Sequence, residues 1–174
     1  FGTAFGLNQQ LYNFWSKNGM KIVYLRQVPS DITGEHSCIM LKRMNAPLVP
    51  EIPSDWLERY NEDFQARFSN LLPLEFRAFP ATLALSLFSS EPRPRPINRD
   101  ELLLALGEKG LSRLVAYAQQ LVDYRLILDL LPALSRWELC GRLSLHATAL
   151  QRCAFLALAL QGKSVEATAK ELGV

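Results

Sequence analysis

The side chains best suited to acid–base chemistry are the two histidines, His36 and His146, which stand far apart in the sequence. Glu35 directly precedes His36, and a carboxylate beside an imidazole can act as an acid–base pair. The residues after His36 are apolar and predict a buried strand, which favours a hydrogen-bonded histidine at the strand edge instead. His146 lies in a nearly apolar segment, which is typical of a core or interface histidine. We therefore assign no catalytic residue.

The three cysteines, Cys38, Cys140 and Cys153, form no CxxC pair and have apolar neighbours. This pattern is typical of reduced thiols in the core of an intracellular protein. Because the two histidines are distant and no cysteine is suitably placed beside them, the sequence predicts no metal site.

Several arginines are candidates for phosphate binding, since the guanidinium is a planar fork of donors that stays charged. Two of them alternate with three prolines over residues 92–96, which predicts an extended basic loop. A solvated loop is the alternative, and the sequence leaves both open. The net charge of +2 and the pI near 8.5 are mild for a nucleic-acid binder. The candidate RNA-binding residues are Arg93, Arg95, Arg99 and Arg113.

The composition indicates a globular protein that forms a core, with 49% hydrophobic and 21% charged residues among 174. The longest apolar stretch, residues 153–160, is far shorter than the roughly 20 residues that cross a bilayer. No secretory signal opens the chain. We therefore expect no membrane association.

Residues 1–44 predict a helix, a strand, a turn and a second strand. Leu7, Leu11, Phe14 and Trp15 share one face of a helix that Gly19 would end in a left-handed conformation. Strands follow at residues 21–26 and 36–44, on either side of a polar turn. Three prolines within residues 45–53 predict a linker there.

Residues 54–174 predict only helices. Ser54 is a suitable N-cap for the first of them, and Asn98 with Glu101 resembles a capping box. Residues 111–131 predict the longest helix, and residues 145–161 predict the central one. The buried side of the longest helix is predicted to carry Leu114, Tyr117, Leu121, Tyr124 and Leu128. The fold class is therefore α+β and mainly α.

Several longer motifs carry a resemblance to a known family. Trp15 followed by Gly19 and Met20 resembles the aromatic–x–x–x–Gly–hydrophobic motif near the end of GNAT-type acetyltransferase domains. Five longer runs stand out, namely Phe5-Gly6-Leu7, Val23-Tyr24-Leu25-Arg26-Gln27, Thr33-Gly34-Glu35-His36-Ser37-Cys38-Ile39-Met40-Leu41-Lys42, Val122-Asp123-Tyr124-Arg125-Leu126-Ile127 and Gly162-Lys163-Ser164-Val165. With these runs the sequence closely resembles the eukaryotic RNA cytidine acetyltransferases, which are related to the bacterial tRNA(Met) cytidine acetyltransferase.

The resemblance implies that residues 1–44 are the C-terminal part of a GNAT domain, a helix plus the final β-hairpin, and that residues 54–174 are a helical tail that binds tRNA or other RNA. It implies a full enzyme that transfers acetyl from acetyl-CoA to cytidine N4 in 18S rRNA and tRNA, with ATP bound by an upstream module. The implied setting is small-subunit ribosome biogenesis in the nucleus and nucleolus. The implied partners are rRNA, tRNA, the pre-ribosomal particle, snoRNA or protein adaptors, and a second copy in a homodimer.

The sequence departs from the GNAT pattern at two points. Many GNAT enzymes carry a tyrosine that protonates the leaving CoA thiolate, and Trp15 stands at that position without a usable proton. The glycine-rich loop for the CoA pyrophosphate is also missing from residues 1–6, so we expect it before residue 1. We accordingly expect these 174 residues alone to be inactive.

Arg26 is the one residue that we assign to acetyl-CoA. It ends the first predicted strand, inside the strongest matching run, and should share a strand face with Tyr24. The alternative is an arginine at the rim paired with Asp31 or Glu35.

Two other functions remain open from the sequence. One is an unrelated GNAT enzyme with a helical protein-interaction tail. The other is a helix-turn-helix DNA-binding protein, because residues 163–174 resemble the first helix and glycine turn of that motif. The sequence upstream of Phe1 would separate these functions.

Overall fold

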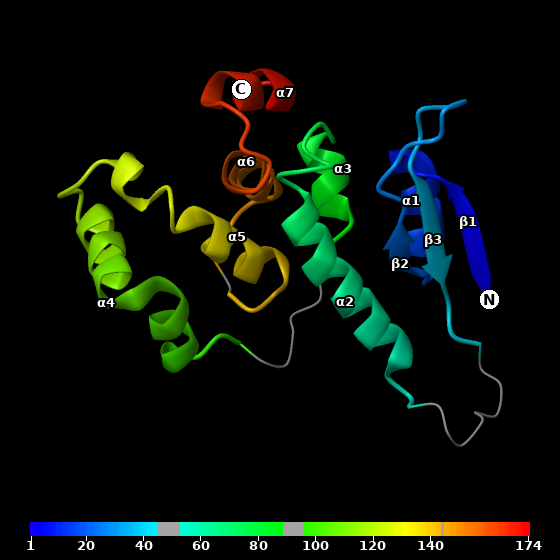
Figure 1. The fold of residues 1–174 in the computed structure, drawn as a ribbon, viewed down its shortest axis with the longest axis horizontal. Coiled ribbons are helices and arrows are strands. Elements are labelled where there is room, and N and C mark those ends of the chain that lie inside the picture. Colours follow the sequence, from blue (N-terminus) through cyan, green and yellow to red (C-terminus); the bar gives the residue numbers. More distant parts are fainter. Residues whose placement is uncertain (45–52, 89–95, 144) are drawn as a thin grey trace. The chain divides into compact units, whose positions relative to one another are not determined.

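The computed structural model describes residues 1–44, 53–88, 96–143 and 145–174. It is mainly helical with one small sheet, so the predicted α+β class with mostly helices is confirmed (Figure 1). The chain forms two compact units, Phe1–Phe79 and Pro80–Val174. The predicted boundaries at residues 44 and 54 stay a prediction, since most of the predicted linker lies outside the described residues. None of the described helices is both long and apolar enough to span a membrane.

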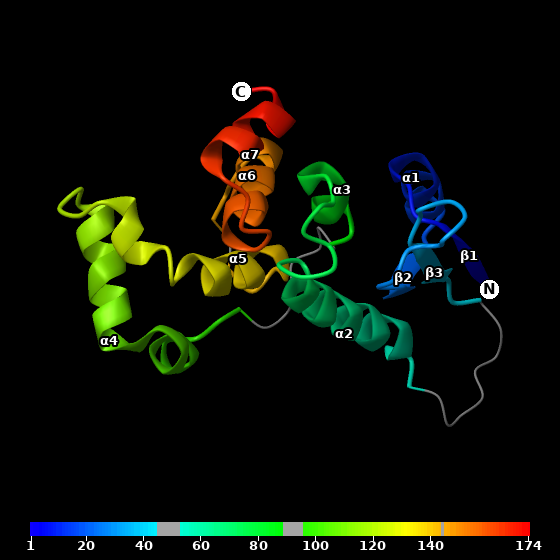
Figure 2. The ribbon, with the colours of Figure 1, turned by 45° about the horizontal axis from the view of Figure 1, so that its top comes forward.

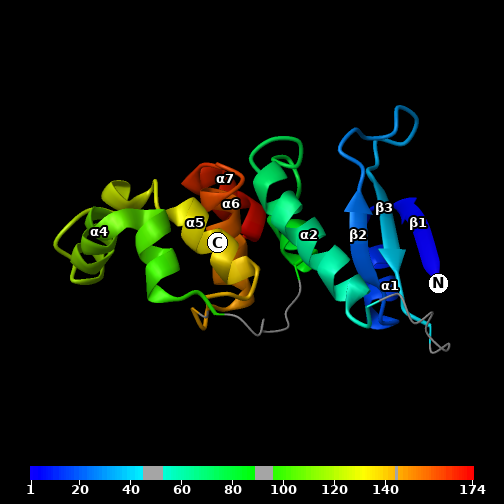
Figure 3. The same ribbon diagram turned by 60° about the horizontal axis from the view of Figure 1, so that its bottom comes forward.

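The first unit contains an antiparallel sheet in the order β1-β3-β2, with β3 in the middle (Figure 3). Its elements are β1 (Gly2–Gly6), α1 (Gln9–Lys17), β2 (Lys21–Leu25) and β3 (Ser37–Leu41). The predicted order of helix, strand, turn and strand is confirmed. The sequence did not predict β1, because its two glycines are poor strand formers and its partner β3 lies more than thirty residues along the chain.

Helix α1 ends as predicted, because Gly19 adopts a φ of +77° directly after its C-cap, Asn18. The predicted buried face is wrong at Leu11 and Phe14, both of which are exposed. Tyr12 is the buried side chain of α1 instead. Successive residues lie about 100° apart around a helix. The buried face of α1 is therefore rotated by about that angle from the face that carries Leu11.

A β-bulge interrupts β2 between Ile22 and Tyr24. Ile22 and Leu25 are therefore both buried although they lie three residues apart, where a regular strand would place them on opposite faces. Helix α2 (Trp56–Leu71) packs against β2 at this bulge. The Asn61 amide donates to the Ile22 carbonyl at 2.8 Å, and Gln65 donates to Asn61 at 3.0 Å. Buried polar groups thus join the helix to the irregular point of the strand.

Aromatic rings form another part of this core. Phe68 stacks on Phe64 with centroids 5.6 Å apart and meets Phe76 at 5.3 Å. The helix begins at Trp56 with Asp55 as its N-cap, one residue after the predicted cap at Ser54. Tyr60, Phe64 and Phe68 lie along one face of α2. Phe64 and Phe68 are buried, whereas Tyr60 near the N-terminal end is 61% exposed.

The second unit contains a group of helices around α6, whereas α4 packs with η1 (Figure 2). Helices α3, α5 and α7 all pack on α6, so the predicted central helix is confirmed. The predicted capping box is also confirmed, because Asn98 accepts from the Glu101 amide at 2.8 Å. The elements are α3 (Ala81–Ser86), α4 (Arg99–Ala118), the 3-10 helix η1 (Tyr124–Ile127), α5 (Leu131–Leu139), α6 (Ala149–Ala159) and α7 (Val165–Leu172).

The predicted long helix over residues 111–131 is wrong. Helix α4 ends at Ala118, and a turn leads into η1 before α5 begins at Leu131. Gln120 adopts a φ of +60°, which no helix can continue. The side chains predicted to be buried are therefore largely exposed, including Tyr117 at 43%, Leu121 at 72% and Tyr124 at 42%.

We predict that Asn61→Ala loosens the first unit. The substitution removes the buried donor to the Ile22 carbonyl, a change that costs about 1–3 kcal/mol. Hydrogen–deuterium exchange of peptides from β2 and β3 in the full-length protein should accelerate about tenfold or more. Asn70→Ala is the matched control, since Asn70 is exposed on the same helix and its side chain donates to the local Ala66 carbonyl. Equal exchange in the two variants would contradict the role given to Asn61.

Candidate functional site

Arg26 lies directly after β2, and its backbone is fixed on both sides. Its amide donates to the Ser37 carbonyl at 2.8 Å, and its carbonyl accepts from His36 Nδ1 at 2.8 Å. The side chain is exposed. No ion pair joins it to Asp31 or Glu35, all three being within the described part of the chain. Its guanidinium is therefore available to a ligand, while the cofactor role itself stays a prediction.

Glu35 and His36 do not form an acid–base pair. The Glu35 carboxylate lies against Gly6, so closely that a side chain at Gly6 would clash with it. The His36 ring is half-buried, with the rings of Phe76 and Phe79 edge-on to it at 5.3 and 5.1 Å. With Nδ1 on the Arg26 carbonyl, His36 is the hydrogen-bonded strand-edge histidine that the sequence favoured.

A cleft of about 630 Å³ opens between the sheet and α2 in the first unit. This volume falls within the range of small-molecule sites. Trp56 and Tyr60 stand edge-to-face at 6.0 Å on the helix side, and Arg67 pairs with Asp63 at 3.8 Å. The cleft can hold a planar or apolar group but offers no unpaired carboxylate for proton transfer. It is lined by Val23, Tyr24, Leu41, Trp56, Tyr60, Asp63 and Arg67.

The predicted phosphate contacts have different surroundings. Arg99 is the exposed first residue of α4, whereas Arg93 and Arg95 lie outside the described residues. Arg113 follows the kink that Gly107 makes in α4, with a φ of +68°. All four stay predictions as RNA contacts.

Arg113 forms a clamp between α4 and η1. Its guanidinium donates twice to Asp129, at 2.9 and 2.8 Å, and once to the Leu126 carbonyl at 2.7 Å. The hydrogen bond from Arg113 holds the pKa of Asp129 below its usual range. The structure therefore gives Arg113 a positioning role that the sequence did not indicate.

No group of three metal-ligating side chains occurs among the described residues. Cys38 is fully buried, and burial raises the pKa of its thiol to about 12. Burial also raises the pKa of Cys153. Because the thiolate is the reactive form of cysteine, neither residue has the environment of a nucleophile.

Two family descriptions match the chain. "GNAT acetyltransferase 2" matches residues 1–45, and "Possible tRNA binding domain" matches residues 56–174. The chain is 38% identical to a protein of Dictyostelium discoideum, 39% to one of Homo sapiens and 33% to one of Saccharomyces cerevisiae. These matches cover 98–99% of the chain, and each of the three proteins is named RNA cytidine acetyltransferase. The chain belongs to the RNA cytidine acetyltransferase family.

The resemblance seen in the sequence motifs is thereby confirmed, and it is preferred to the two alternatives, the unrelated GNAT enzyme and the helix-turn-helix protein. The chain spans 17–18% of the length of these three relatives. Sequence reasoning missed the cleft beside α2, because its lining comes from both sides of the predicted linker. The one local signal for it was the aromatic pair Trp56 and Tyr60, four residues apart on an exposed helix face.

We predict that Cys38 is inert to alkylating reagents at pH 8.5. A raised pKa keeps the folded thiol protonated until the pH approaches 12, so almost no thiolate exists under these conditions. In the full-length protein, iodoacetamide followed by mass spectrometry should modify Cys38 at least about tenfold more slowly than the half-buried Cys140. The difference should vanish in denaturant. Equal native rates would show that the strand does not bury Cys38.

Proposed function

We propose that this chain is the C-terminal part of an RNA cytidine acetyltransferase that transfers acetyl from acetyl-CoA to cytidine N4 in 18S rRNA and tRNA. The observation that carries the proposal is the match of nearly the whole chain to proteins of that name at 33–39% identity. Helix α1 with the antiparallel β2 and β3 would close the GNAT domain. The helices after the predicted linker would form the RNA-binding tail.

The chain's own residues would bind and position the cofactor. When bound, acetyl-CoA supplies an activated thioester carbonyl to the cytidine amine. Arg26 fits a phosphate of this cofactor, because its backbone is fixed by Ser37 and His36 while its guanidinium is exposed. The N4 amine loses one proton in the reaction and the leaving sulfur gains one. Trp15 can do neither transfer, so we place the acid and base elsewhere in the longer protein.

The proposal extends to the setting of the full-length protein. We propose that the reaction depends on ATP bound by an upstream module and takes place in small-subunit ribosome biogenesis, in the nucleus and nucleolus. The partners would be rRNA, tRNA, the pre-ribosomal particle, snoRNA or protein adaptors, and a second copy of the enzyme. The membership of the chain in the RNA cytidine acetyltransferase family supports these steps.

We predict that the full-length protein labels cytidine when it is incubated with RNA, ATP and acetyl-CoA carrying a radioactive acetyl group. Digestion of the RNA to nucleosides should place the label in N4-acetylcytidine, because the amine is the acceptor in this proposal. Omission of ATP should abolish the signal. Label found only on protein or polyamine would contradict the RNA substrate, and unchanged labelling without ATP would contradict the ATP requirement.

We predict that Arg26→Ala in the full-length protein raises the KM for acetyl-CoA about tenfold, as expected when a charge-assisted phosphate contact is lost. Folding and RNA affinity should stay nearly unchanged, because the side chain is exposed. Arg26→Lys should give an intermediate KM, since it keeps the charge but loses the fork.

The matched control is Arg59→Ala, an exposed arginine of the same unit whose ion pair with Asp55 is local to the N-terminal end of α2. If the acetyl-CoA KM is the same in the Arg26 and Arg59 variants, Arg26 does not bind the cofactor. Unfolding of Arg26→Ala would instead assign Arg26 a structural role.

A further inference from the structure

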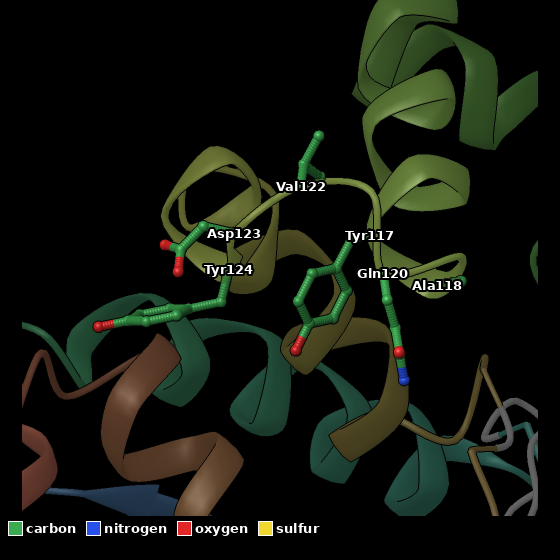
Figure 4. Close-up of a pocket in the computed structure, with 6 residues that line it drawn as sticks. All are labelled: Tyr117, Ala118, Gln120, Val122, Asp123 and Tyr124. Atoms are coloured by element: carbon green, nitrogen blue, oxygen red, sulfur yellow. The ribbon is translucent and has the colours of Figure 1, made fainter.

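The turn between α4 and η1 forms an open pocket of about 480 Å³ in the second unit (Figure 4). The Tyr117 ring lies between the side chains of Gln120 and Tyr124 in this view, and Val122 points away from them. The volume suits a ligand of the size of one nucleoside. The lining residues are Tyr117, Ala118, Gln120, Val122, Asp123 and Tyr124.

Gln120 is held in the pocket by a strained backbone. Its φ is +60°, in the left-handed region where glycine is the usual residue after a helix. Two hydrogen bonds fix this conformation: Gln120 N–H to the Tyr117 carbonyl at 2.9 Å and Leu121 N–H to the Ala116 carbonyl at 2.9 Å. A glutamine at such a position costs about 1 kcal/mol or more relative to glycine. The strain points to a use for the side-chain amide.

The other wall of the pocket is fixed independently. Asp123 accepts from the Arg125 amide at 2.9 Å and so begins η1. The Arg125 guanidinium lies 5.0 Å from the centroid of the Tyr124 ring. The clamp from Arg113 to Asp129 and to the Leu126 carbonyl ties η1 to α4. The backbone that carries Tyr117 and Tyr124 is therefore held in place, and each of these residues is more than 40% exposed.

The chemistry of these groups fits a nucleobase better than an apolar partner. Exposed tyrosine rings provide planar faces on which unpaired bases stack. The Gln120 amide and the Asp123 carboxylate can hydrogen-bond the edge of a base. An apolar protein surface would bury the Gln120 amide without a partner, which is unfavourable.

We infer that this pocket binds one unpaired nucleobase of the substrate RNA. The inference rests on the proposed function, which makes RNA the substrate, and on the match of residues 56–174 to a "Possible tRNA binding domain". Tyr117 and Tyr124 stack on the base, and Gln120 contacts its edge. The Arg125 guanidinium, which lies over the Tyr124 ring and pairs with Asp123 at 3.3 Å, adds positive charge to this wall.

The test measures the affinity of the full-length enzyme for a fluorescent transfer RNA transcript. Tyr117→Ala should weaken binding about tenfold or more, because stacking on an aromatic ring contributes strongly for each base. Tyr117→Phe keeps the ring and should bind like the unchanged protein. The slope of log affinity against log salt should not change in either variant, since no phosphate contact is lost.

Gln120→Gly separates a binding role from a structural one. Glycine relieves the positive φ, so the variant should be at least as stable as the unchanged protein. Its RNA affinity should nevertheless fall about fivefold through loss of the amide. Gln119→Ala is the matched control, because Gln119 is the exposed neighbour that does not line the pocket, and it should bind RNA normally.

The RNA position that the pocket binds can be identified with transcripts that each carry one abasic position. At the position bound by the pocket, Tyr117→Ala should cause no further loss of affinity, since the two changes remove the same interaction.

RNA affinities of Tyr117→Ala and Gln120→Gly within twofold of the unchanged protein would overturn the inference. A change in sedimentation of the same variants would then assign the turn, with its exposed Leu121 and Leu126, to a protein interface. Failure of the unchanged enzyme to bind RNA or to form N4-acetylcytidine would refute the proposed function itself. Normal RNA binding by the pocket variants, in contrast, would refute only the role of the pocket.

Discussion

The first unit depends on the amide of Asn61, which satisfies the Ile22 carbonyl where β2 departs from regular geometry. The bulge changes which side chains of β2 are buried and leaves Tyr24 and Arg26 exposed at its C-terminal end. A bulge needs support from neighbouring groups, and here a helix supplies it through a buried amide. The cleft lined by Tyr24 and Trp56 follows from this contact, because α2 approaches the strand at that point.

In the second unit an irregular segment is also held by polar bonds, but through charged groups and not through a buried amide. The buried side chain of η1 is Ile127, and one buried side chain holds this short helix only weakly. The Arg113 guanidinium holds it in place through Asp129 and the Leu126 carbonyl. In both units, exposed aromatic rings lie on a backbone that polar bonds fix. The ring faces stay accessible while the backbone that carries them is held in place.

Local chemistry in the sequence predicted the local features well. Gly19 and the Asn98–Glu101 capping box depend only on residues next to them in the sequence, and the structure has both as predicted. Strand β1 was missed because its stability comes from pairing with a distant strand. The turn at Gln120 was missed because the apolar spacing of Leu114 to Leu128 continued through it. The family could be identified from motifs, whereas the cleft and the pocket depend on which apolar side chains the packing leaves exposed.

His36 connects two parts of the first unit that lie far apart in the sequence. Its ring touches Phe76 and Phe79, and its Nδ1 holds the carbonyl of Arg26. The chain passes into the second unit at Pro80, one residue beyond Phe79. The imidazole therefore joins the last residues of the first unit to the backbone beside Arg26. Loss of the His36 ring would alter the packing of Phe76 and Phe79 and the hydrogen bond at Arg26 together.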